Sequence, residues 1–429
     1  MKKYYYEIVI FLIKIIIINS IIKIPFKKVY KEKNITSENI MDILLYNDLE
    51  IHLEIGTPSQ SFPVLIKLQE SPTFILSNNS TKKIKKYNPQ LSSTCINYNE
   101  KVNSYSQYHC YDSIYIQDTF YFDNKNIQIN DFYFILSNNA KFDSTLTSGE
   151  LGLKFYSMTF NEKAHFLYQL KNKQLIEYSV FTLEYINKEE GNLIIGNYPH
   201  KFNNKSYKKE DFIFTNIGTF DSVCQWNIFF DKIISNNSTI DSKITIDLYY
   251  EFSFIIGNEK FRKTVYQNFF EKYLNNKTCI LNSVSKDSFY TYTECNNDIN
   301  IKEFPDLIFI NNNLNFNFTF TYEDLFMEYG NKYYFLIVFK SNRNIWSFGN
   351  IFFKKYQITF DKEKKIFGLY KKYHNTSFNF SPWLYICILG FFFIISLLLI
   401  IYLIRLLMKK RKIRANELED QFEYIPYNL

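Results

Sequence analysis

Two short, mostly apolar runs in this chain are each followed by a charged residue suited to acid–base chemistry. Lys67 follows the run Val64-Leu65-Ile66, and Asp247 follows the run Ile244-Thr245-Ile246. A carboxylate can serve as a general acid or base, and a lysine held beside it favours the ionised form and lowers its pKa. The two residues are far apart in the sequence, so joint chemistry requires a fold that brings them together.

The residues around Lys67 are predicted to form strands. Between residues 49 and 75 apolar and polar residues alternate, which is typical of a half-buried strand. Gly56-Thr57-Pro58 interrupts the alternation and predicts a tight turn. Lys67 is therefore expected on a strand that enters a turn.

In the second half of the chain, an amphipathic helix is expected from about residue 260 to residue 274.

Residues 55–75 resemble the N-terminal active-site strand of the pepsin-like aspartic peptidases. The family pattern I-G-T-P-x-Q-x-F-x-V-h-h-D-T-G-S-S-x-h-W-h, in which h is apolar, aligns without a gap. Lys67 then occupies the position of the first catalytic Asp, and Leu68-Gln69 replaces the Thr-Gly that follows it. Asp247 lies at the distance expected for the second Asp, but Leu248-Tyr249-Tyr250 replaces the usual Thr-Gly-Thr/Ser.

Further family motifs follow in the expected order between residues 49 and 370. The resemblance implies a mostly β, bilobal pepsin-like fold with a cleft between the lobes. Tyr105 is the candidate for the tyrosine of the flap that closes over substrate, although the family's flap glycines are absent. The matching segments are residues 86–94, 111–116, 148–153, 191–196, 226–233, 304–309 and 346–356.

The resemblance also implies that this site has lost the acid–base chemistry of the family. The family uses two carboxylates that share one proton across a bound water. With Lys67 opposite Asp247, we expect an ion pair in place of that water, much as a propeptide lysine silences the family's zymogens. Two alternatives remain open: both residues are surface residues of a relaxed site, or Glu70 or Glu251 supplies the second acid. No cofactor and no metal site are predicted.

Six cysteines are compatible with an oxidising compartment. Cys279 and Cys295 bracket the loop where the family has a disulfide in its second lobe. Cys95 and Cys110 flank the flap and are predicted to form a second bridge. Cys224 is left as either a buried thiol or an intermolecular link, and Cys387 falls in an apolar segment.

The ends of the chain predict a membrane protein of the secretory pathway. An N-terminal apolar run is typical of a signal peptide, with an uncleaved anchor as the alternative. Near the other end, residues 383–404 are long and apolar enough to span a bilayer, and the basic residues that follow place the tail in the cytoplasm. Glycosylation sequons in the part between them begin at Asn34, Asn78, Asn204, Asn236, Asn276, Asn317, Asn375 and Asn379.

The predicted organisation follows from these segments. It comprises a signal peptide (1–22), a truncated propeptide-like leader (23–48), an N-terminal lobe (49–196), a C-terminal lobe (197–372), a juxtamembrane segment (373–382), a membrane helix (383–404) and a cytoplasmic tail (405–429). The leader is expected either to lie in the acidic cleft or to form an edge strand.

Three functions are compatible with these features. The first is a single-pass type I membrane protein, at the cell surface or on endomembranes, that is catalytically impaired and binds a peptide or protein in its cleft. The second is an active aspartic endopeptidase with an unorthodox site, and the third is a glycosylated structural surface protein. The net charge of +7 is modest and the lysines are scattered outside the tail, which argues against a nucleic-acid partner.

Overall fold

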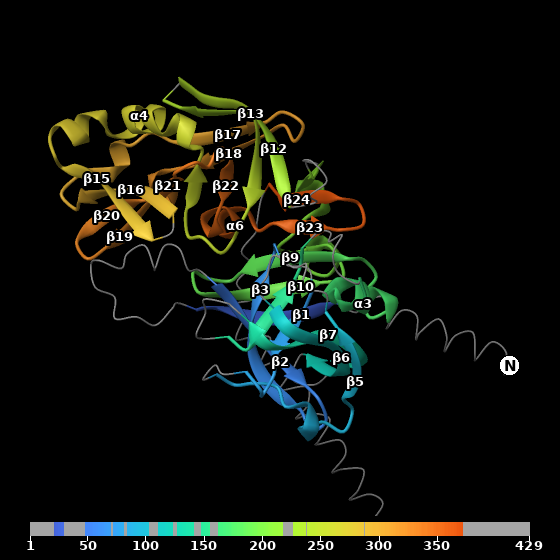
Figure 1. Cartoon of the computed structure of the whole chain (residues 1–429). Coiled ribbons are helices and arrows are strands. Elements are labelled where there is room, and N and C mark those ends of the chain that lie inside the picture. Colours follow the sequence, from blue (N-terminus) through green and yellow to red (C-terminus); the bar gives the residue numbers. More distant parts are fainter. Residues whose placement is uncertain are drawn as a thin grey trace, which may run out of the picture. The chain divides into compact units, whose positions relative to one another are not determined.

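The described part of the chain is mostly β-structure. The computed structural model describes residues 21–29, 48–69, 72–80, 84–102, 110–122, 127–140, 147–154, 162–217, 226–236, 238–286 and 288–371. Two large sheets account for most of these residues (Figure 1), which confirms the mostly β prediction. The described α-helices are α3 (Phe166–Asn172), α4 (Arg262–Asn275), α5 (Tyr322–Leu325) and α6 (Asn350–Tyr356).

The first sheet has 13 strands and contains both the earliest and the last described strands. In order across the sheet they are β11 (Phe212–Asn216), β24 (Ile366–Tyr370), β23 (Thr359–Asp361), β9 (Val180–Tyr185), β10 (Glu190–Ile195), β1 (Ile22–Val29), β2 (Asp48–Ile55), β3 (Gln60–Lys67), β8 (Gly149–Gly152), β4 (Phe74–Leu76), β7 (Ile127–Ala140), β6 (Cys110–Phe122) and β5 (Ile96–Lys101).

The second sheet has 11 strands. Its main path is β18 (Phe316–Phe320), β17 (Leu307–Asn311), β12 (Asn227–Ser235), β13 (Ser238–Leu248), β22 (Trp346–Phe348), β14 (Ile255–Gly257), β21 (Ile337–Lys340), β16 (Ser288–Asn296), β20 (Lys332–Phe335) and β19 (Phe326–Tyr329), with β15 (Cys279–Lys286) paired to β16.

Both sheets contain the same run of four strands. The order β3-β8-β4-β7 in the first sheet matches β13-β22-β14-β21 in the second. In each run the first pair is parallel, the middle pair is antiparallel and the last pair is parallel. In each sheet, one strand near the predicted catalytic position, β8 or β22, therefore lies between two others and is parallel to one and antiparallel to the other.

Strand β1 shows that the leader belongs to the folded sheet. Its alternate residues Ile22, Ile24 and Phe26 are buried, and those between them are exposed. It pairs with β10 on one side and β2 on the other, so it is an internal strand. The expectation of an edge strand or a segment in the cleft is wrong for residues 22–29, because their apolar face completes the core.

The predicted lobe boundary at residues 196 and 197 does not divide the two sheets. Strands β11, β23 and β24 come after this boundary in the sequence, yet they extend the first sheet beyond β9. Their own residues explain this, because β23 and β24 are buried along their whole length and pack against the strands from the first half. The two halves of the chain thus share one sheet.

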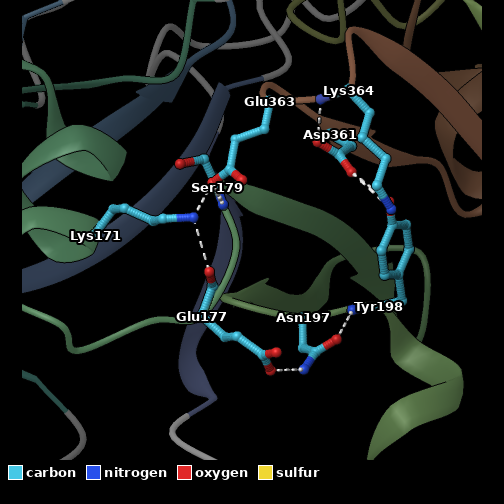
Figure 2. A network of polar contacts seen from close by, with 8 residues as sticks. All are labelled: Lys171, Glu177, Ser179, Asn197, Tyr198, Asp361, Glu363 and Lys364. Carbon is cyan, nitrogen blue, oxygen red and sulfur yellow. Dashed lines mark hydrogen bonds and ion pairs between the residues drawn. The ribbon is translucent and has the colours of Figure 1, made fainter. Parts of the chain in front are cut away.

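A polar network reinforces this junction (Figure 2). Glu363, in the turn between β23 and β24, accepts hydrogen bonds from Lys171 Nζ at 2.6 Å and from the backbone N of Ser179 at 2.8 Å. Asp361 of the same hairpin accepts a hydrogen bond from the hydroxyl of Tyr198, and Lys364 Nζ lies 3.1 Å from that hydroxyl. The last hairpin is therefore held by charged hydrogen bonds as well as by sheet pairing.

A Glu363→Gln variant is expected to be less stable at neutral pH but not in acid. Burial alone would raise the pKa of Glu363, but the hydrogen bonds from Lys171 and Ser179 outweigh it and hold the pKa below 4.5. A depressed carboxyl pKa stabilises the fold above the unfolded value, and this stabilisation is lost as the pH falls through the folded value. We expect the midpoint of thermal unfolding to fall by roughly 1–2 °C at pH 7 and the difference to vanish near pH 3. Glu210→Gln, at an exposed site, is the control; an equal loss at both pH values would contradict the assignment.

The predicted membrane helix at residues 383–404 lies outside the described residues. Within the described part of the chain, no helix is both long enough and apolar enough to span a membrane.

Candidate functional site

Lys67 ends β3 at the point where this strand meets β8. It is paired in parallel register with Gly152. We call the place where β3 meets β8 the first crossing. Its Nζ lies 2.7 Å from Asp48 Oδ1, and the two side chains are only 16% and 14% exposed. Asp48 reaches it because β2 and β3 are antiparallel neighbours, with Glu50 opposite Leu65. The lysine thus forms a largely buried ion pair within its own hairpin.

Two more carboxylates act on the same ammonium group. Burial alone would lower the pKa of Lys67, but attraction from Asp48, Glu251 and Glu150 outweighs it and raises the pKa above its ordinary value. Lys67 is therefore charged at any pH at which the protein would work. We call Lys67, Asp48, Glu150 and Glu251 the Lys67 cluster.

Glu251 is the unusual member of this cluster. Burial raises its pKa, and nearby Asp48 does the same, while Lys67 and a backbone hydrogen bond oppose them without cancelling the effect. Its Oε2 is buried and has no hydrogen-bond partner among the described residues. The ring of Tyr250 beside it is fully buried. Glu251 therefore lies in a site that disfavours its charged form.

Asp247 lies on β13, opposite Ser347 of β22. The charged group beside it is Arg343, whose Nη2 is 3.6 Å from Asp247 Oδ2. Burial raises the pKa of Asp247, and Arg343 partly offsets this. The predicted ion pair between Lys67 and Asp247 is therefore wrong: Lys67 pairs with Asp48, and Asp247 faces Arg343.

The sheet register explains why the two residues do not pair. At the second crossing, where β13 meets β22, Leu248 is opposite Phe348, and the backbone N of Tyr249 donates to Phe348 O at 2.8 Å. Continuing this register places Tyr249 opposite Gly349, just as Lys67 is opposite Gly152.

The next strand of each sheet gives the same alignment. Phe74 of β4 pairs with Glu150, and Ile256 of β14 pairs with Ser347. Phe74 follows Lys67 by the same number of residues as Ile256 follows Tyr249. By both criteria the residue equivalent to Lys67 is Tyr249, two positions after Asp247.

Two hydrogen bonds join the crossings to each other. Gln69 Nε2 donates to Leu248 O at 2.8 Å, and Trp226 Nε1 donates to Leu153 O at 3.0 Å. All the atoms involved belong to buried residues. Gln69 stands where the aligned family pattern has a glycine, and its longer side chain links the first crossing to the second.

The sequence of this chain matches one model of a known protein family. A sequence model described as eukaryotic aspartyl protease matches residues 50–372, which is most of the chain and includes both crossings. The chain belongs to the eukaryotic aspartyl protease family. No curated protein matches it at a significant level.

Within this aspartyl protease family member, one predicted disulfide is present and the other is not. Cys279 and Cys295 are bonded and lie opposite each other on β15 and β16, as predicted. Cys95 is a free thiol. It immediately precedes β5, whose first residue, Ile96, pairs with Gln117, seven positions along β6 from Cys110. Several residues at about 3.3 Å each separate these positions, too far for a bridge between Cys95 and Cys110.

The other predicted site residues differ in what can be said of them. Tyr105, Glu70, Cys224 and Cys387 lie outside the described residues, as do Asn34, Asn375 and Asn379. The five remaining sequon asparagines, at 78, 204, 236, 276 and 317, are all exposed, as glycosylation would require. Glycosylation of this family member stays a prediction.

Sequence reasoning missed Asp48, Glu150 and Arg343 as parts of the site. Asp48 is the residue just before the predicted strand, and pairing that strand with the next one would have placed it opposite Lys67. Arg343 carried no motif, so no signal in the sequence pointed to it.

Proposed function

We propose that this protein is a membrane-anchored member of the aspartyl protease family that has lost peptidase activity and binds a peptide or protein partner. The observation that carries this proposal is the Lys67 cluster. A lysine with a raised pKa holds the first catalytic position, and the register gives the second position to Tyr249.

The chemistry of peptide hydrolysis explains why this arrangement is inactive. The reaction needs one ionised and one protonated carboxyl group on either side of a water molecule. The ammonium group of Lys67, whose pKa is raised by its carboxylate neighbours, cannot accept a proton from water, so the first catalytic position offers no general base. Loss of general acid–base catalysis alone slows a reaction by about 10²–10⁴, and loss of groups that act as a unit slows it further.

The full-length protein is expected not to cleave denatured protein substrate between pH 3 and pH 7. A statine-type transition-state analogue and a Glu251→Gln variant, which removes the buried carboxyl group beside Lys67, are the controls for any cleavage observed. Cleavage abolished by both controls would contradict the proposal and favour the active endopeptidase. Binding of unfolded peptides without cleavage would support it over a purely structural surface protein.

The proposed topology has its own test. We propose a single-pass protein with most of its mass outside the cytoplasm, anchored by residues 383–404 after removal of a signal peptide. Endoglycosidase treatment of the protein from cells is expected to reduce its apparent mass, and carbonate washing is expected to leave it in the membrane. Release by carbonate, or an unchanged mass, would contradict the corresponding part of the proposal.

A further inference from the structure

A pocket of about 510 Å³ lies over the edge of the second crossing. Its wall is formed by β12, β13, the start of β22 and the turn before α4. We call it the Asp247 pocket. Its polar and aromatic lining includes Asn227, Asp241, Lys243, Asp247, Lys260 and Trp346.

Two hydrogen-bond acceptors lie side by side in this pocket. Asn227 and Asp247 are direct cross-strand partners on β12 and β13, so their side chains share a face. Asn227 is 3% exposed, and its Oδ1 has no hydrogen-bond partner among the described residues. A buried acceptor without a donor is costly, and such groups usually find a partner in a ligand or water.

Arg343 does not satisfy the carboxylate of Asp247. The separation of 3.6 Å between Arg343 Nη2 and Asp247 Oδ2 exceeds a normal hydrogen-bond length. Arg343 Nη2 instead donates to Ser347 Oγ at 2.6 Å, and the guanidinium lies 5.4 Å from the ring centre of Tyr249. These two contacts keep the guanidinium group beyond hydrogen-bonding distance of the Asp247 carboxylate. Asp247 can therefore still accept hydrogen bonds from a ligand.

The other charged groups of the pocket are either satisfied or at its rim. Asp241 accepts hydrogen bonds from Trp346 Nε1 at 3.0 Å and from Ser242 N at 2.7 Å. Lys243 and Lys260 are exposed, so solvent screens their repulsion of a cation. The unsatisfied groups are therefore acceptors on the inner wall, which suit a ligand with several N–H donors and a positive charge.

We propose that the Asp247 pocket binds the guanidinium group of an arginine side chain in a peptide or protein ligand. A guanidinium offers five N–H donors in a planar arrangement, enough to meet both the Asp247 carboxylate and Asn227 Oδ1. Its apolar stem can lie against Ile345, an exposed apolar residue of the pocket lining. This inference rests on the proposed peptide-binding function and specifies which residue of the ligand is recognised.

The test compares two matched probes on the full-length protein. N-acetyl-arginine N-methylamide carries the charge, and the corresponding citrulline compound is its neutral analogue. Binding is followed by the ¹⁵N-indole signal of Trp346, with Trp226 as the internal control. We expect the arginine probe to shift Trp346 and to bind at least about tenfold more tightly than the citrulline probe.

Variants test the source of this preference. Asp247→Asn is expected to abolish the difference between the probes, and Arg343→Gln is expected to strengthen arginine binding because a competing cation is removed. Asp298→Asn, which removes an exposed carboxylate of the same half, should change neither. Equal binding of the two probes, or a preference that survives Asp247→Asn, would overturn the inference.

The outcomes also separate this inference from the proposed function. If unfolded peptides bind without any preference for arginine, peptide binding stands and the pocket assignment falls. If the arginine probe binds as expected but no peptide does, the pocket assignment stands for a free cationic ligand and the proposed peptide-binding function falls.

Discussion

A Lys67→Met variant is expected to lose about 3–5 kcal/mol of its free energy of unfolding, the usual effect of removing one partner from a buried ion pair. Lys67 and Asp48 are 2.7 Å apart and mostly shielded from water. Without the lysine, Asp48 lies near Glu251 and Glu150 with no cation between them. The pKa of Glu251 should rise further, because Lys67 is the main influence that lowers it.

An exposed pair of the same type provides the matched control for this prediction. Lys171 and Glu363 are 2.6 Å apart, but their side chains are 37% and 39% exposed. Lys171→Met is therefore expected to cost less than about 1 kcal/mol. Both variants would be compared by urea denaturation followed through tryptophan fluorescence.

Changing both partners of the buried pair separates the loss of the ion pair from the loss of packing. Lys67→Met combined with Asp48→Asn removes both charges, and we expect it to recover much of the stability lost by Lys67→Met alone. If Lys67→Met proves no more damaging than Lys171→Met, the Lys67 cluster is not buried as described. Lys67→Asp should be at least as damaging as Lys67→Met, because it adds a carboxylate to three others, and it should not restore peptidase activity.

The sequence was sufficient for the fold class and for the position of Lys67. The ungapped match over residues 55–75 placed Lys67 at the end of a strand, and the structure has it at the end of β3. The pairing of Cys279 with Cys295 also followed from the family resemblance. These features depend on local motifs with several matching residues.

The second half of the site could not be predicted in the same way. Asp247 was aligned with the second catalytic Asp of the family on the identity of this one residue, because Leu248-Tyr249-Tyr250 does not match the family pattern. Residues two apart on a strand point to the same face, so alternation cannot distinguish Asp247 from Tyr249 at the crossing. A β-bulge between Ile233 and Ile234 in the β12–β13 hairpin further shifts the register.

The partner of Lys67 was missed for a different reason. The resemblance directed attention to the residue across the two halves of the chain, but the nearest carboxylate belongs to the neighbouring strand. Local pairing brings Asp48 beside Lys67 without help from the second half. An ion pair within one hairpin also requires less chain closure than one between residues 180 positions apart.

Gly349→Ala is the second change for which we expect a large effect, a loss of about 3 kcal/mol in the free energy of unfolding. Gly349 joins β22 to α6 and has φ of −93°, which any residue can adopt. The difficulty is space: a Cβ there would lie 2.1 Å from Phe254 O and 2.4 Å from Phe252 O. Both atoms are backbone, and Phe252 O already accepts a hydrogen bond from Asn350 N. Neither can move without disturbing the loop that follows Tyr249.

The result of this substitution bears directly on the register at the second crossing. Gly330→Asn is the control, because Gly330 has φ of +56° in open space and asparagine tolerates that conformation. We expect the control to change the free energy of unfolding by less than about 0.5 kcal/mol. A Gly349→Ala protein as stable as the control would mean that β22 does not pass this close to residues 252–254. The alignment of Tyr249 with Lys67 would then fail, and Asp247 would again be the residue to consider as the partner in catalysis.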